Sequence, residues 1–99
     1  MHSLTSLSSQ AFESMGAPMN RAQVIARLQE IFDNIFLEPV VLTPELSAHD
    51  VEEWDSLIHI SLIVAVEKEF NIRFRVGEVE ARSNVGEFAD LISRRMGER

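Results

Sequence analysis

The chain has 99 residues, and its 16 acidic side chains outnumber its 9 Lys and Arg, for a formal net charge of −7. Apolar residues make up 45% of the sequence, so one compact domain with a hydrophobic core is expected. The lack of cysteine excludes disulfides, thiolate nucleophiles and thiolate zinc sites, and the lack of a Lys and Arg cluster argues against a nucleic-acid partner.

Residues 1–18, MHSLTSLSSQAFESMGAP, are rich in serine and contain no Lys or Arg. They lack the basic start of a secretory signal and the Arg content of a transit peptide. We interpret them as a flexible N-terminal leader and expect the folded domain over residues 19–97. No apolar run reaches the ~18–20 residues that a membrane span needs, and we expect a cytoplasmic protein.

The first helix is predicted over residues 20–37. Asn20 followed by Gln23 resembles a capping box, in which each side chain satisfies a free backbone N–H. Apolar residues then recur at steps of three and four, which predicts a helix with one buried face. These residues are Val24, Leu28, Ile31, Phe32 and Ile35.

A long connection, EPVVLTPELSAHDVEEWD, follows over residues 38–55 and contains six acids and no Lys or Arg. Thr43-Pro44 is compatible with one short turn. The run from His49 to Asp55 invites comparison with a calcium loop, but it lacks the required Gly and the alternating ligand spacing. We therefore interpret it as a solvated acidic loop and predict no metal site.

The second helix is predicted over residues 56–70, with Asn71 as its stop because Asn tolerates the left-handed conformation. A helical wheel gives it two apolar stripes. One contains Leu62, Ile63, Val66 and Phe70, with His59 among them. The other contains Leu57, Ile60 and Val64, flanked by Glu67 and Lys68. A helix in a small bundle is rarely covered on both sides, so the second stripe is predicted to meet a partner or ligand.

Residues 72–76 alternate apolar and basic side chains, and we expect an extended link followed by a short helix near 77–81. Asn84 and Glu87 form a second capping-box candidate, and the last helix carries an apolar stripe of Val85, Phe88, Leu91 and Ile92. Arg73, Arg75 and Arg82 are interpreted as scattered surface charge. The predicted fold is all-α: a small antiparallel bundle of three or four helices with a long loop between helices one and two.

Ser56 follows Asp55 at the predicted start of the second helix. With Asp55 as the cap, the Ser56 hydroxyl stays free, and a phosphate attached there would gain roughly 0.3–1 kcal/mol from the helix dipole. The alternative is that Ser56 is merely an additional cap. A nucleophile and base pair of Ser56 and His59 is also conceivable, but the sequence identifies no third group to orient the base and no oxyanion site.

The motif DSL at residues 55–57, after an acidic connection and before the continuation VEKEFNIRF, resembles that of an acyl carrier protein, and the similarity covers residues 20–97. The resemblance implies that a phosphopantetheinyl transferase, using magnesium and coenzyme A, attaches 4′-phosphopantetheine to Ser56 through a phosphodiester. The thiol of the arm then carries an acyl group as a thioester. Asp55 and Leu57 match the residues that flank the attachment site, and the protein itself is not an enzyme.

The resemblance also assigns the two stripes of the second helix. His59, Leu62, Ile63, Val66 and Phe70 would form the core or border the space for the acyl chain. Leu57, Ile60, Ser61, Val64 and Glu67 would form the surface that acyl-loading and acyl-transfer enzymes recognise. Asp55 and Glu67 match acidic positions that meet Arg and Lys on such enzymes, where charge mainly speeds and orients encounter.

The sequence departs from the carriers of primary fatty-acid synthesis at several of these positions. Glu53-Trp54 replace the usual Gly-Ala before the motif, Ile58 and Ser61 replace acids, and Lys68 replaces a further acid. We therefore expect a monomeric, freestanding carrier of a specialised fatty-acid, lipid or polyketide-type pathway. A peptidyl or aminoacyl carrier, and a helical interaction module that never carries the arm, remain alternatives.

Overall fold

The structure is a computed structural model that describes residues 19–98. It contains three α-helices, α2 (Arg21–Ile35), α3 (Ser56–Phe70) and α4 (Val85–Glu98), and a short 3-10 helix, η1 (Ala48–Asp50). No β-strand occurs among these residues. The predicted all-α class is therefore confirmed, whereas the predicted leader lies outside the described residues. No helix within residues 19–98 is long and apolar enough to span a membrane.

Helix α2 begins at the predicted capping box. Oδ1 of Asn20 accepts a hydrogen bond from the Gln23 backbone N–H at 2.8 Å, and the Asn20 N–H donates to Gln23 Oε1 at 2.9 Å. The helix ends at Ile35, two residues before the predicted end, because Phe36 adopts an extended conformation (φ −86°, ψ 140°). In that conformation the Phe36 ring stacks on Phe32 with centroids 4.9 Å apart.

The acidic connection is held to the bundle by polar contacts. Both carboxylate oxygens of Glu53 accept backbone N–H groups, from Leu37 at 2.8 Å and Glu38 at 3.2 Å. The predicted turn at Thr43 forms, with the Leu46 N–H donating to the Thr43 carbonyl at 3.1 Å. Farther along, the 3-10 turn of η1 follows at Ala48–Asp50. Glu53 therefore works as a structural anchor for the loop.

Helix α3 has the predicted bounds and the predicted ends. Oδ1 of Asp55 accepts the Ile58 N–H at 2.9 Å at the start of the helix, and Asn71 takes the left-handed conformation (φ 56°, ψ 52°) at its end. The segment between α3 and α4 differs from the prediction, because residues 76–81 form turns in place of a short helix. Gly77 has a positive φ of 80°, which is incompatible with a right-handed helix starting there.

Helix α4 is capped by Asn84, whose Oδ1 accepts the Glu87 N–H at 2.9 Å. The Glu87 side chain reaches back to the Ser83 N–H at 2.8 Å rather than to Asn84 itself, so the predicted box is shifted by one residue. All four predicted apolar residues of α4 are buried: Val85, Phe88, Leu91 and Ile92.

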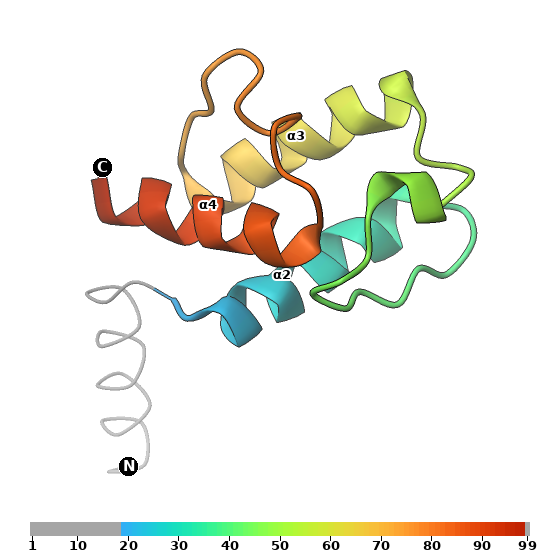
Figure 1. Cartoon of the computed structure of the whole chain (residues 1–99), viewed down its shortest axis with the longest axis horizontal. Helices are drawn as coiled ribbons and strands as arrows, with labels where there is room; N and C mark the ends of the chain where they lie inside the picture. Colours follow the sequence, from blue (N-terminus) through green and yellow to red (C-terminus); the bar gives the residue numbers. More distant parts are fainter. Residues whose placement is uncertain (1–18, 99) are drawn as a thin grey trace, which may run out of the picture.

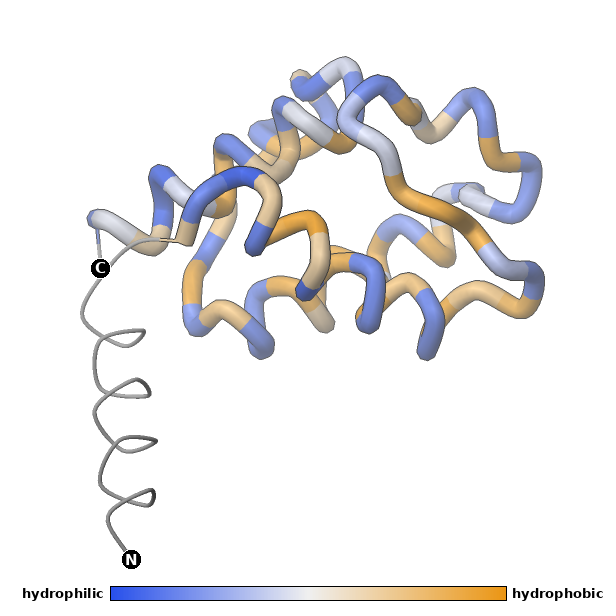
Figure 2. The backbone as a smooth tube through the Cα atoms, turned by 90° about the horizontal axis from the view of Figure 1, so that it is seen from below, coloured by the Kyte–Doolittle hydropathy of each residue, from blue (hydrophilic) through white to orange (hydrophobic). Residues whose placement is uncertain are grey.

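Helix α2 packs against both α3 and α4 and runs antiparallel to them in Figure 1. Helices α3 and α4 run in the same direction, because residues 71–84 lead the chain back along the bundle (Figure 1). Hydrophobic and hydrophilic segments alternate along all three helices (Figure 2), as expected when each helix buries one face. No polar or charged residue of the described chain is buried.

Candidate functional site

Ser56 is the first residue of α3, and its side chain is exposed. The cap bond from Ile58 to Asp55 occupies the preceding carboxylate, so the serine is not needed as a cap. Its hydroxyl makes no hydrogen bond to any residue in 19–98. A second molecule can therefore reach the hydroxyl without breaking an internal contact.

The residue before the cap fixes this end of α3 to the core. The Trp54 ring packs edge-on against Phe32, with centroids 5.2 Å apart, and against Phe36 at 5.9 Å. Trp54 thus anchors the end of the acidic connection on the core. The hydroxyl of Ser56 is consequently presented from a rigid helix end rather than from a free loop.

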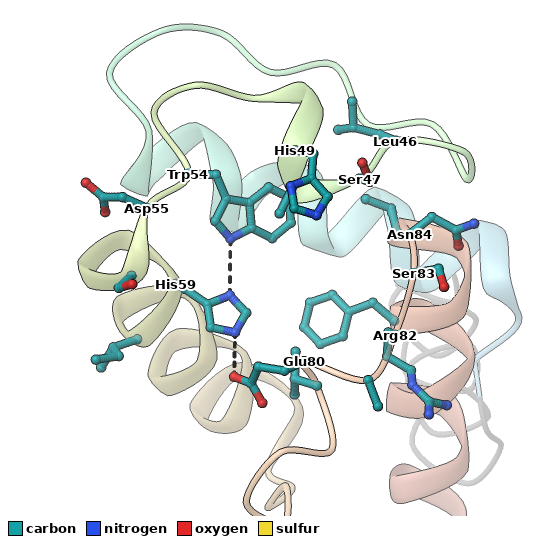
Figure 3. Close-up of a pocket in the computed structure, with 17 residues that line it drawn as sticks. Leu46, Ser47, His49, Trp54, Asp55, His59, Glu80, Arg82, Ser83 and Asn84 are labelled. Carbon is teal, nitrogen blue, oxygen red and sulfur yellow. Dashed lines mark hydrogen bonds and ion pairs between the residues drawn. The ribbon is translucent and has the colours of Figure 1, made fainter.

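His59 bridges two parts of the chain and is not directed at Ser56. Trp54 Nε1–H donates to His59 Nδ1 at 3.2 Å, and His59 Nε2 lies 2.8 Å from Glu80 Oε2 (Figure 3). Because an indole N–H can only donate, Nδ1 must be the acceptor, and the ring proton sits on Nε2 and points to Glu80. Both ring nitrogens are therefore occupied, which argues against His59 as a base for Ser56.

Glu80 is well suited to accept the hydrogen bond from His59 Nε2–H. Its pKa lies below the ordinary value, first because its own backbone N–H donates to the carboxylate and next because His59 hydrogen-bonds to it. Both hydrogen bonds thus favour the ionised carboxylate. The chain of contacts from Trp54 through His59 to Glu80 ties the acidic connection, α3 and the 76–81 turns together, and we call it the Trp–His–Glu bridge.

A pocket of about 910 Å³ lies beside the bridge and includes Ser56 in its wall. Its wall comes from η1, from the first turns of α3 and from residues 79–88 (Figure 3). Polar side chains such as Asn84 stand next to apolar ones such as Val79 and Phe88. Arg82 also contributes to the wall, and its buried Nε has no hydrogen-bond partner among residues 19–98.

The residues predicted to form the core or border an acyl chain occupy different places. Leu62, Val66 and Phe70 are buried in the core, and Ile63 is half-buried against it. Only His59 of this group lines the pocket. Sequence reasoning missed Glu80, because its distance from His59 along the chain follows no helical or strand period. The interpretation of Arg82 as surface charge was wrong, since Arg82 is half-buried in the pocket wall.

The second stripe of α3 faces solvent. Leu57 is 73% exposed, Ile60 61% and Val64 47%, and Ser61 is exposed among them. Glu67 also borders this face, but it is half-buried and its Oε2 accepts the Phe74 N–H at 2.8 Å. Ile58 is half-buried and packs against the core. Of the two residues that stand in place of acids, only Ser61 is therefore open to a partner.

No group of three or more potential ligands among residues 19–98 could hold a metal ion. In the acidic connection, Glu53 is engaged by backbone N–H groups and Asp50 by Ser47, whose N–H donates to it at 3.0 Å. These carboxylates organise the loop from within.

Comparisons with known proteins agree on one family. No family model matches the sequence. An acyl carrier protein from Thermosynechococcus vestitus is 28% identical over 79 residues, which are 79% of this chain and 98% of that relative. The solution structure of a holo acyl carrier protein from Geobacter metallireducens superposes with a TM-score of 0.69 at 39% identity, over 76% of this chain and 87% of the other.

Proposed function

The chain belongs to the acyl carrier protein family, and from this premise we propose that Ser56 is the attachment residue of a 4′-phosphopantetheine arm. Members of this family are carriers and not enzymes. The observation that supports Ser56 most directly is its position: an exposed hydroxyl without an internal hydrogen bond, at the first residue of a capped helix.

The residues around Ser56 fit such an arm. A phosphodiester at Ser56 would lie at the N-terminus of α3, where free backbone N–H groups and the helix dipole favour an anion. The neighbouring pocket has polar groups that suit the amides of the arm and apolar side chains that suit an acyl chain. When attached, the arm supplies the thiol that holds acyl groups as thioesters, which the cysteine-free chain does not contain.

The protein's own residues position the attachment site. Asp55 caps the helix through the Ile58 N–H and so fixes the helix start at which Ser56 lies. Trp54 holds this end of α3 against Phe32, and the Trp–His–Glu bridge forms one wall of the pocket. We infer that cargo shelters in this pocket beside the bridge rather than among Leu62, Val66 and Phe70, which are fully packed in the core.

Partner enzymes would recognise the exposed stripe of α3. Leu57, Ile60 and Val64 offer apolar contact beside Ser61 and Asp55, and the partners would be a phosphopantetheinyl transferase and the enzymes that load and remove the acyl group. Ser61 replaces an acid of the primary fatty-acid carriers on this open surface. We therefore propose service to a specialised pathway, as a cytoplasmic monomer, with residues 19–97 as the carrier domain and residues 1–18 as a leader.

A peptidyl or aminoacyl carrier would use the same serine and the same arm, so it differs from this proposal only in cargo. A helical interaction module would use the exposed stripe and leave Ser56 unmodified. The second alternative makes a different prediction about mass, which a direct experiment can measure.

The experiment incubates the full chain with coenzyme A, magnesium and a promiscuous phosphopantetheinyl transferase and measures intact mass. We expect a gain of one phosphopantetheinyl group that disappears in Ser56→Ala. Ser61→Ala is the matched control, because Ser61 is an exposed serine on the same helix that should stay unmodified. An unchanged mass for the wild type, or a modified Ser56→Ala chain, would refute the assignment.

A further inference from the structure

A second groove, of about 750 Å³, lies at the end of α3 remote from Ser56. The last two turns of α3 contribute Val64 and Lys68, the extended link contributes Arg73 and Arg75, and the end of α4 closes the groove. In the sequence Arg73 and Arg75 were interpreted as scattered surface charge. The reversal of the chain at Asn71 brings them together, and we call Lys68, Arg73 and Arg75 the cationic cluster.

The groove is positive although the chain as a whole is strongly negative. Its lining contains the cationic cluster and Arg95 against the carboxylates of Glu67 and Glu98. When Glu78, the ion-pair partner of Arg95, is also counted, four cations face three carboxylates, a net charge of +1, whereas the whole chain carries −7. Arg95 is held in ion pairs with Glu78 and Glu98. The Glu67 carboxylate is engaged by the Phe74 N–H. The groove therefore offers positive charge that its own carboxylates do not neutralise.

The three members of the cationic cluster are exposed. None of them forms an ion pair with any residue in the described part of the chain, 19–98. Each can thus contact an anionic group on another molecule without losing an internal salt bridge. The cluster differs in this respect from Arg21 and Arg27, which pair with Asp90 and Glu69.

The cluster continues the apolar stripe that begins next to Ser56. Lys68 follows Val64 by four residues, and Val64 follows Ile60 by four, so all three lie on one face of α3. Val64 lines the groove and also belongs to the exposed stripe. A molecule lying along α3 would therefore meet the serine, then apolar side chains, then positive charge.

We propose that the enzymes served by this carrier dock along α3 with an apolar ridge on Leu57, Ile60 and Val64 and with carboxylates in the groove, against the cationic cluster. This inference rests on the proposed carrier function and specifies its partners. Carboxylates there would set the register of docking, because in the groove they meet cations without ion-pair partners while the chain as a whole is acidic. An anionic membrane or a nucleic acid would also bring negative charge against the acidic surface around the groove, and a chain with a net charge of −7 would repel it.

The test uses two synthetic helical peptides with the same apolar face. One carries three glutamates at its C-terminal end and the other carries three lysines there. Each is titrated into the isotopically labelled full chain, with and without the arm on Ser56, and backbone amide shifts are recorded. We expect the glutamate peptide to bind more tightly, to shift the amides of Val64, Lys68, Arg73 and Arg75, and to weaken as salt is added.

The variant that tests the cluster combines Lys68→Glu, Arg73→Glu and Arg75→Glu. All three positions are exposed, so the fold should persist, and the amide spectrum reports whether it does. We expect affinity for the glutamate peptide to fall about tenfold or more and the preference between peptides to reverse. Arg94→Glu is the control, because Arg94 is an exposed cation of α4 outside the groove, and its effect should be small.

Several results would overturn the inference. These are equal or tighter binding of the lysine peptide, no binding of either peptide at millimolar concentration, and an equal loss in Arg94→Glu. Binding to vesicles of phosphatidylcholine and phosphatidylglycerol (3:1) that the triple variant abolishes would replace an enzyme partner with a membrane. The peptide titration does not require the arm, so failure of this inference and failure of the proposed carrier function can be told apart. Ser56 can be modified while the glutamate peptide fails to bind, and the glutamate peptide can bind while Ser56 stays unmodified.

Discussion

Asp55 combines two roles that substitutions can separate: its side chain caps α3, and its charge lies next to Ser56. The cap is a single hydrogen bond of 2.9 Å from the Ile58 N–H to Oδ1 at an exposed helix end. Asp55→Ala removes the cap and the charge together. Asp55→Asn removes the charge and keeps an oxygen that can accept the same N–H.

The expected magnitudes follow from the role of the cap. Loss of a side-chain cap costs about 1 kcal/mol of the free energy of unfolding, so Asp55→Ala should lower the melting temperature by about 4–8 °C for a domain of this size. Asp55→Asn should cost only a few tenths of a kcal/mol, since Asn and Asp are nearly equal as caps. Asp55 is exposed, so no cavity contribution adds to these figures.

The assay is urea unfolding followed by circular dichroism at neutral pH, together with the initial rate of phosphopantetheinyl transfer to Ser56. If the cap bond matters most for presenting the serine, Asp55→Asn retains both stability and transfer rate, whereas Asp55→Ala loses both. Equal destabilisation by the two substitutions would refute the cap argument. A slow transfer rate in Asp55→Asn with full stability would instead assign the charge to contact with the transferase.

Three further predictions concern the packing, charge and partner surface of the same helices. Leu62→Ala should lower the free energy of unfolding by about 2–5 kcal/mol, because Leu62 is fully buried. Leu57→Ala should change it by less than about 0.5 kcal/mol, because the Leu57 side chain is 73% exposed. Urea unfolding measures both, and similar losses would contradict the division of α3 into a core face and a partner face. The pKa of Glu78 lies below its ordinary value of 4.5, first because Arg95 hydrogen-bonds to the carboxylate and next because the Arg75 backbone N–H does. The ionised Glu78 therefore stabilises the folded state fully above pH 4.5, and this stabilisation is lost as the pH falls through the lower pKa of the folded state. Glu78→Gln should therefore reduce the loss of unfolding free energy as the pH falls into the acid range, in low and in high salt. The effect of Asp90→Asn should instead fade in high salt, because its pair with Arg21 is half-exposed. An acid loss that is the same in Glu78→Gln as in the wild type would contradict this. Ser61→Glu should leave stability unchanged and raise the rate at which a ketosynthase of the general fatty-acid synthase uses the carrier about two- to tenfold. Ile58→Asp should instead lower the free energy of unfolding by about 1–3 kcal/mol, because Ile58 packs on the core. An unchanged ketosynthase rate in Ser61→Glu would remove the argument for a specialised set of partner enzymes.

Helix starts could be predicted from the sequence because caps are local. Asn20, Asp55 and Asn84 each accept a backbone N–H three residues ahead, and that contact depends on little outside one helical turn. The end of α2 could not be predicted as well, since Phe36 leaves the helix to stack on Phe32 under Trp54. There a tertiary contact overrides the local preference.

Two features of the site depend on long-range geometry that no local pattern contains. The bond from His59 to Glu80 joins a helix to a turn that follows the left-handed residue Asn71 and the positive φ of Gly77. The same reversal at Asn71 gathers the cationic cluster around one groove. Ser56 could be anticipated because its cap and its motif are adjacent in the sequence, whereas the pocket wall and the groove required the path of residues 71–84.

The central claim is that Ser56 carries a phosphopantetheine arm in the cell. Tandem mass spectrometry of the protein isolated from its source organism tests this most directly. The account predicts fragments that place a phosphopantetheinyl group, free or acylated, on the peptide containing Ser56. An unmodified Ser56 in growing cells, or the same group on another serine, would contradict it.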